Sequence, residues 1–279
     1  MIPLVDIGIN LAHDSYERDR AEVIARARQA GVVAMVVTGS TLDDSARAIA
    51  LCRGVPGTLR ATAGVHPHHA TTLRESDAPR LAELLADPMT VAAGECGLDY
   101  YRNFSPPAEQ RRAFAMQLRL ATEHRRPLFL HQRDAHADFL AMLREHPDLA
   151  SRAVLHCFTG GVGELEDCLA AGLHIGVTGW VCDERRGQAL RESAACIPED
   201  RLMLETDGPY LLPRTLQPKP PQRRNEPMYL PLFLDAVAQC RGQAREAVAA
   251  ATTANACRFF GLTLSTVATA AGKTTYEVV

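Results

Sequence analysis

Short apolar runs alternate with longer amphipathic segments along most of the chain. The runs lie at residues 4–9, 32–39, 60–65, 91–96, 127–131, 153–157, 173–179 and 202–207. They are aliphatic or β-branched and lack strict alternation, which is typical of parallel strands buried on both faces. Each run is therefore expected to form a strand.

The segments between the runs have helical character. In residues 105–124, Phe114 and Leu118 lie four positions apart, which is helical spacing. Ser105 is a candidate N-cap, and Pro106 suits the first helical turn. This segment is expected to form an amphipathic helix.

The number of strand and helix units predicts the fold class. Eight such units in about 260 residues indicate an α/β fold, a single-domain (β/α)8 TIM barrel that spans residues 1–262. An open doubly wound sheet is the alternative, but no GxGxxG turn follows the first strand. Residues 263–279 are polar and rich in small side chains, so we expect a C-terminal tail there.

Composition narrows the class of protein. Apolar residues make up 47% and charged residues 23% of the chain, as in globular proteins. The net charge of −3 argues against a protein that coats nucleic acid along its whole length, although a local basic patch remains compatible with it. The eight cysteines contain no CxxC pair, so reduced thiols are expected rather than a zinc site.

Targeting signals are not evident in the sequence. No apolar run approaches the roughly 20 residues of a membrane helix, and the N-terminus has no basic region followed by a cleavage site. We therefore expect a cytoplasmic protein without membrane contact, and a monomer.

Residue types that bind metals gather at the ends of the predicted strands. They are Asp6, His66, Glu95, His131, His156 and Asp207. The C-terminal ends of barrel strands converge on one mouth. Unpaired charges gathered there would be costly to desolvate without a cation. The chain is therefore expected to bind a divalent metal ion.

Several short motifs resemble a known family. GVHPHH, AAGECGLDYYRNFS, FLHQRDA, VLHCFTG, TGWVCDERRG, LETDGPYLLP and RRNEP occur in the order and roughly at the spacing of the TatD family of metal-dependent deoxyribonucleases. The resemblance runs from about residue 4 to 261. It implies a metal-dependent hydrolase of the TIM-barrel type, a 3′-5′ exonuclease on single-stranded DNA and RNA, supported by Mg²⁺.

The same resemblance implies a set of metal ligands. They are Glu95, His131, His156 and Asp207. Family members usually carry an Asp-x-His-x-His strand at the start, whereas this chain has Gly8 and Asn10 in the two histidine positions. Positions 8 and 10 lie on the same side of the strand, so both missing histidines would have been at one place. A second metal beside Asp6 is therefore expected to bind weakly or to arrive with the substrate. Asp6 itself either helps there or closes the first strand through hydrogen bonds.

The proposed chemistry gives Asp207 two roles. A metal with open coordination positions polarises a phosphoryl oxygen and lowers the pKa of a bound water. Asp207 is expected to act both as a ligand and as the catalytic general base. Glu205 is expected to point the other way along the strand, and either to pack against a barrel helix or to pair outside the mouth. The ligand types suit Mg²⁺, and also Mn²⁺ or Zn²⁺.

Other residues are candidates for substrate binding. We expect His66 to contact a phosphate oxygen, and Arg133 either to clamp a phosphate or to tie a loop carboxylate. Tyr100 or Tyr101 is a candidate for stacking on a base. The segment 208–227 either grips the anionic strand or is a solvated connector; its basic residues are Arg214, Lys219, Arg223 and Arg224.

Two other classes of function remain open. The same barrel and metal chemistry serve deacylases and other amide or ester hydrolases. The end of the fourth strand carries Glu95 rather than the lysine that binuclear amidohydrolases modify to bridge two metals, which counts against that class. The missing histidine pair also leaves open a catalytically silent barrel that only binds nucleic acid.

Overall fold

Eight parallel strands follow one another in chain order around a barrel. The computed structural model describes residues 2–268 and 274–279. The strands are β1 (Leu4–Ile9), β2 (Val32–Val37), β3 (Leu59–Ala63), β4 (Thr90–Asp99), β5 (Leu128–Arg133), β6 (Ala153–Leu155), β7 (His174–Val177) and β8 (Leu202–Leu204). All eight predicted strands are present, and β4 extends three residues beyond the predicted end.

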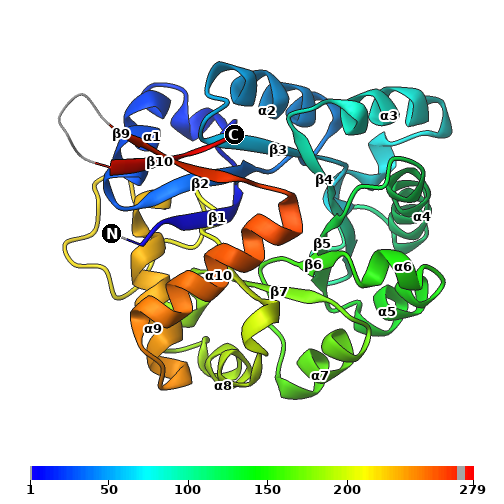
Figure 1. The fold of residues 1–279 in the computed structure, drawn as a ribbon. Coiled ribbons are helices and arrows are strands. Elements are labelled where there is room, and N and C mark those ends of the chain that lie inside the picture. Colours follow the sequence, from blue (N-terminus) through cyan, green and yellow to red (C-terminus); the bar gives the residue numbers. More distant parts are fainter. Residues whose placement is uncertain (1, 269–273) are drawn as a thin grey trace.

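Most of the helices surround the strands, and the last one lies across one end of the barrel (Figure 1). The helices are α1 (Arg20–Gln29), α2 (Leu42–Gly54), α3 (Ala78–Ala86), α4 (Pro107–Glu123), α5 (His136–Arg144), α6 (Pro147–Ala150), α7 (Val162–Ala170), α8 (Gln188–Cys196), α9 (Leu230–Arg241) and α10 (Arg245–Phe260). The fold is a single-domain TIM barrel, as predicted. Within the described ranges, no helix combines the length and the apolar character needed to cross a membrane.

The start of α4 differs from the prediction. Pro106 is the N-cap residue, and Ser105 does not cap the helix. The Ser105 hydroxyl instead donates to the backbone oxygen of His68 at 2.9 Å. Phe114 and Leu118 are buried against the barrel, as their spacing predicts.

Asp6 joins the first strand to the segment that follows the last. Its Oδ1 accepts from the backbone N–H of Thr206 at 2.9 Å, and its Oδ2 accepts from the Thr206 hydroxyl at 2.5 Å. The backbone N–H of Asp207 also donates to Gly8 O at 2.8 Å. Asp6 is fully buried, and burial raises the pKa of its carboxyl to about 7. Of the two roles considered for Asp6, the structure supports closure of the barrel by hydrogen bonds.

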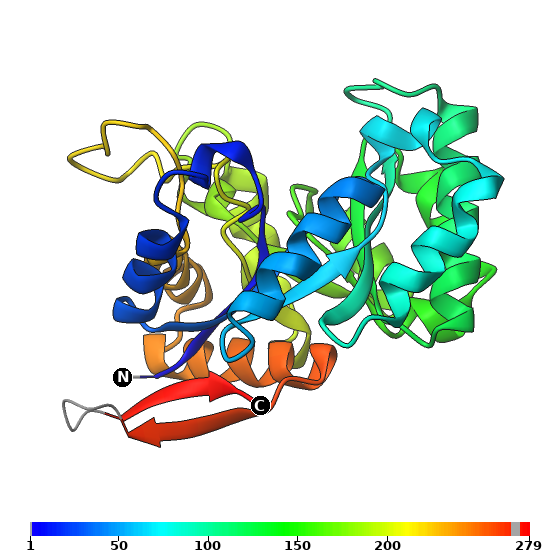
Figure 2. The same ribbon diagram turned by 90° about the horizontal axis from the view of Figure 1, so that it is seen from above.

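The barrel interior is filled from the end opposite the mouth. One buried apolar cluster combines inward-facing strand residues with the C-terminal part of the chain, its members including Ile7, Val36, Phe129, Met203, Phe260, Leu262 and Val278. Helix α10 lies across this end of the barrel, as Figure 1 and the side view in Figure 2 show. A second, larger cluster lies between the strands and the surrounding helices.

The segment after residue 262 contains regular structure. Strands β9 (Leu264–Ala268) and β10 (Thr274–Val278) pair as an antiparallel hairpin beside α10 (Figure 2). Val278 is buried, and its N–H donates to Gly57 O at 2.9 Å. Residues 269–273 of the expected tail lie outside the described residues. The division of the chain at residue 262 remains a prediction.

Candidate metal centre

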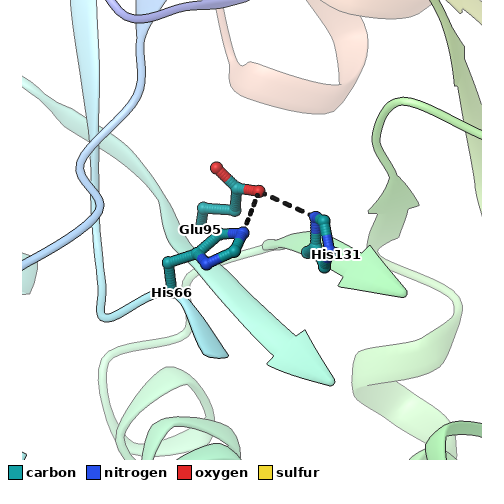
Figure 3. Close-up of side chains that lie close together, drawn as sticks. All are labelled: His66, Glu95 and His131. Atoms are coloured by element: carbon teal, nitrogen blue, oxygen red, sulfur yellow. Dashed lines mark ion pairs between the residues drawn. The ribbon is translucent and has the colours of Figure 1, made fainter. Parts of the chain in front are cut away.

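Three imidazole rings surround one oxygen atom of Glu95. Glu95 Oε1 lies 3.2 Å from His66 Nε2, 3.1 Å from His131 Nδ1 and 2.8 Å from His156 Nε2. One ligand atom from each of His66, Glu95 and His131 lies within 4.8 Å of the others (Figure 3). Glu95 and His131 belong to β4 and β5, whereas His156 directly follows β6 and His66 lies in the loop after β3. Neighbouring strand ends thus place the four side chains together.

His131 is held by a second carboxylate. Its Nε2 lies 3.1 Å from Asp99 Oδ2, and His68 Nε2 lies 2.8 Å from the same oxygen. Burial opposes the ionisation of Asp99, but the hydrogen bonds from His131 and His68 hold its pKa well below its usual range. A carboxylate behind a histidine fixes the ring and its tautomer. Asp99 is not among the predicted site residues, and it lies in the part of β4 beyond the predicted end.

His156 is oriented by Glu205, in contrast to the sequence prediction. Glu205 Oε2 lies 3.2 Å from His156 Nδ1, and Oε1 accepts from the backbone N–H of Cys157 at 2.5 Å. The expectation that Glu205 packs against a helix or pairs outside the mouth is therefore wrong. Residues two apart on a strand share a face, so alternation alone would place Glu205 on the same side as Asp207; β8 itself ends at Leu204, before both residues. Glu205 is fully buried inside the barrel.

The carboxylate of Glu205 occupies the space beside Gly8. A Cβ atom at position 8 would collide with Glu205 Oε2 and would lie 3.0 Å from Phe129 Cζ. A Cβ at Gly176 would lie only 2.5 Å from Glu205 Oε1. No larger side chain fits at position 8 while Glu205 stays in place. In this chain, a buried carboxylate thus fills the space next to the first strand.

Asp207 lies next to this cluster and contacts Asn10. Asn10 Nδ2 donates to Asp207 Oδ1 at 3.0 Å and lies 3.2 Å from Gly208 O. The backbone of Asp207 has a positive φ of 51°, so its side chain leaves the direction set by β8. Burial raises the pKa of Asp207 to about 7, against the opposing charge of His156. The role of Asp207 as ligand and base stays a prediction, as does the whole ligand set.

The donor groups around Glu95 fit a divalent cation. Burial opposes ionisation of Glu95, yet the facing imidazoles of His156 and His66 hold its pKa well below its usual range. Burial likewise disfavours the charged form of His156, but Glu95 and Glu205 raise its pKa well above the ordinary value. The ionised carboxylate therefore requires a positive partner, which a protonated imidazole or a metal ion can supply. Carboxylate and imidazole donors suit Mg²⁺, Mn²⁺ and Zn²⁺.

Exposed aromatic rings flank the mouth. Tyr101, Phe104 and Tyr210 expose 58%, 68% and 53% of their surface, respectively, and they follow β4 and β8. The Phe104 ring lies 4.8 Å from the ring of His68. Tyr100, in contrast, donates from its hydroxyl to Asp138 at 2.8 Å. Of the two predicted stacking candidates, only Tyr101 is exposed, and the sequence analysis missed Phe104 and Tyr210.

The basic residues near the mouth have different environments. The guanidinium of Arg133 lies 5.0 Å from the centre of the Tyr101 ring and 6.0 Å from that of Trp180. Arg224 is nearly buried and pairs with Asp19 at 2.7 Å and with Glu226 at 2.5 Å. Arg224 therefore anchors the 208–227 segment; of the two roles considered for this segment, gripping the substrate strand has no support at Arg224.

Comparison with known proteins places the chain in a family. Residues 5–261 match the family model described as "TatD related DNase". The chain is 55% identical to "3′-5′ ssDNA/RNA exonuclease TatD" of Cronobacter turicensis over 92% of this chain and 97% of the relative. It is 51% identical to the protein of the same name from Musicola paradisiaca over 93% and 98% of the two chains.

Solved structures give the same result. The crystal structure of YJJV, a TatD homologue from Escherichia coli, is 26% identical with a TM-score of 0.87, covering 94% of this chain and 100% of its own. A hydrolase TatD family protein from Entamoeba histolytica is 26% identical with a TM-score of 0.82, covering 92% and 98%. The motifs at the strand ends, the barrel and these matches agree, and the chain belongs to the family of TatD-related DNases.

Proposed function

We propose that the chain is a metal-dependent 3′-5′ exonuclease that hydrolyses phosphodiester bonds of single-stranded DNA and RNA. The convergence of three imidazoles on the Glu95 carboxylate is the observation that carries this proposal. The exonuclease names of relatives at 50–55% identity support the substrate class. They also make an amide or ester hydrolase, or a silent binding barrel, the less supported alternative.

Glu95, His131 and His156 are proposed to hold the metal, with Asp207 completing the set. His66 is close enough to Glu95 to serve as a further ligand, in addition to its proposed contact with a phosphate. Bound Mg²⁺, or Mn²⁺ or Zn²⁺ in its place, would polarise the phosphoryl group and lower the pKa of water. Asp99 and Glu205 orient the rings of His131 and His156, respectively.

Asp207 is proposed to accept the proton of the attacking water. It lies at the mouth, half-buried, and Asn10 holds one of its carboxylate oxygens at 3.0 Å. The other oxygen is left for the water or the metal. A general base must lie within hydrogen-bond reach of the proton that it takes, and a fixed carboxylate beside the Glu95 cluster meets this need.

The rim of the mouth supports a preference for unpaired strands. Tyr101, Phe104 and Tyr210 present exposed ring faces on which the bases of a single strand can stack. Bases within a duplex are already stacked on their neighbours. Arg133, beside Tyr101, is proposed to contact a phosphate. A cytoplasmic location and a monomeric state remain predictions from the sequence.

The test uses a 5′-labelled single-stranded oligonucleotide with added Mg²⁺ or a chelator. We expect stepwise shortening from the 3′ end that stops with chelator, and poorer cleavage of duplex ends. Glu95→Ala should abolish the reaction, whereas Glu83→Ala, a change at an exposed position on α3, should leave it intact. Circular dichroism checks that both variants are folded.

Three results would contradict the proposal. Cleavage that persists in the presence of chelator would exclude a metal-dependent reaction. Release of internal fragments would exclude an exonuclease. Hydrolysis of an acyl ester by the metal-loaded protein, with no cleavage of any oligonucleotide, would favour the deacylase alternative.

A further inference from the structure

A second cavity opens at the end of the barrel opposite the mouth. It is lined by residues at the starts of β4 and β7, by the loops that precede β5 and β6, and by the end of α10. Figure 2 shows α10 at this end, and the loops of the mouth at the other. The cavity has a volume of about 480 Å³. This volume lies within the roughly 300–1,000 Å³ range of small-molecule sites.

The wall of the cavity is strongly basic. It contains Arg125, Arg126, Arg152 and Arg258, and no acidic residue is among the lining residues. Within residues 2–268 and 274–279, none of these arginines forms an ion pair with a carboxylate. Arg126 Nε donates to Leu85 O at 2.8 Å, and Arg152 Nη1 donates to Arg125 O at 3.1 Å. Neutral acceptors position these guanidinium groups without cancelling their charge.

Another part of the wall is aromatic. Phe259 is half-buried, and its ring centroid lies 5.1 Å from that of His174 and 4.7 Å from that of Phe260. Burial and the nearby Arg201 lower the pKa of His174 to about 4, so its ring is neutral at pH 7. Its Nδ1 is buried without a hydrogen-bond partner in the part of the chain that the structure describes.

We propose that this cavity binds a nucleoside phosphate. Guanidinium groups match the geometry and charge of phosphate. A simple inorganic anion has no planar group to stack on the aromatic wall, whereas a nucleoside phosphate has one. A planar base fits against Phe259 and His174, since aromatic stacking accepts any base. The size of the cavity suits a mononucleotide. The site is independent of the proposed nuclease, because it shares none of its residues with the Glu95 cluster.

The test is isothermal titration with AMP in the presence of a chelator, so that binding through a metal at the mouth does not contribute. Wild-type protein should bind one equivalent of AMP. The double variant Arg125→Glu/Arg258→Glu should bind at least tenfold more weakly; both positions are exposed, which favours folding. Arg144→Glu on α5, also exposed and outside the cavity, is the matched control and should bind as the wild type does.

Further arms separate the chemical parts of the ligand. Adenosine should bind at least tenfold more weakly than AMP, and inorganic phosphate likewise. Equal affinity of adenosine or of phosphate, or unchanged AMP affinity in the double variant, would overturn the proposal. A different result would be an oligonucleotide that binds more tightly than AMP, with this binding lost in the double variant. That result would overturn the proposal of a small ligand and show that the cavity binds a nucleic acid strand.

Two additional measurements keep the outcome decisive. If the double variant does not fold, AMP binding is compared between the wild type and Arg125→Gln. The Arg125 side chain forms no hydrogen bond in the described structure, so this change should not disturb folding. Oligonucleotide cleavage is measured on the same samples. AMP binding without cleavage would refute only the proposed nuclease, and cleavage without AMP binding would refute only this site.

Discussion

The most informative perturbation of the metal centre is Glu205→Gln. Both oxygens of Glu205 act as acceptors, one from the N–H of Cys157 and the other facing Nδ1 of His156. Glutamine keeps the shape but replaces one oxygen with an NH₂ donor. If that donor faces His156 Nδ1, the ring must carry its proton on Nε2, which is the atom that faces Glu95. If it faces Cys157 instead, two N–H donors point at each other.

The expected loss can be estimated from these contacts. Removing a partner that orients a metal-binding histidine lowers metal affinity by about 10–100-fold. This corresponds to roughly 1.4–2.7 kcal/mol. A buried donor left without an acceptor also costs about 1–3 kcal/mol of folding free energy, so the variant should unfold at a lower temperature even without metal.

The assay is titration of Mn²⁺ by calorimetry, together with oligonucleotide cleavage over a range of Mg²⁺ concentrations. Glu205→Gln should need about 10–100-fold more metal for half-maximal activity, and should recover much of its rate at saturation. Glu83→Gln serves as the matched control on an exposed helix position. Wild-type Mn²⁺ affinity in Glu205→Gln would refute the reasoning that Glu205 sets the tautomer of His156.

Three other variants test separate features. Gly8→Ala should destabilise the protein by about 1–3 kcal/mol, because the added Cβ collides with Glu205. The control Gly54→Ala, where a Cβ meets open space, should leave stability unchanged. Equal melting temperatures of the two variants would contradict the collision at position 8. Phe104→Ala should raise KM for single strands roughly fivefold or more, by loss of about 1–3 kcal/mol of stacking, with little effect on kcat; an unchanged KM would exclude stacking. Asp6 has a folded pKa of about 7 against an ordinary 3.8, so the folded state holds the proton more tightly and this stability is lost as pH rises from about 4 through 7. Chemical denaturation should therefore show wild type losing stability relative to Asp6→Asn over that range, and a difference independent of pH would argue against the titration.

The strand pattern was readable from the sequence because parallel strands in a barrel are buried on both faces. The prediction failed where pairing rather than hydrophobicity decides the boundary. β4 continues past its apolar run because Leu98 and Asp99 pair with Gln132 and Arg133 of β5. The C-terminal hairpin was missed for a similar reason. Its residues are polar and small, and it is fixed by pairing and by one buried contact of Val278.

The convergence of Glu95, His131 and His156 was also predictable, since strand ends of a barrel meet at one mouth. The carboxylates that orient the two histidines, those of Asp99 and Glu205, were not predicted. Glu205 was assigned to the wrong side although the two-residue period of a strand puts it on the same side as Asp207. Its contact with His156 depends on the irregular segment after Leu204, where the positive φ of Asp207 turns the chain. The role of Arg224 was left open because a sequence does not show that Asp19, two hundred residues away, neutralises it.

Phe260 and Leu262 belong to an apolar cluster that fills the barrel behind the mouth in the part of the chain that the structure describes. Because these packed side chains lie behind Glu95, we expect each released nucleotide to leave by the route along which the substrate came. We therefore expect distributive digestion, in which the polymer dissociates between cuts and products of every intermediate length accumulate as a ladder.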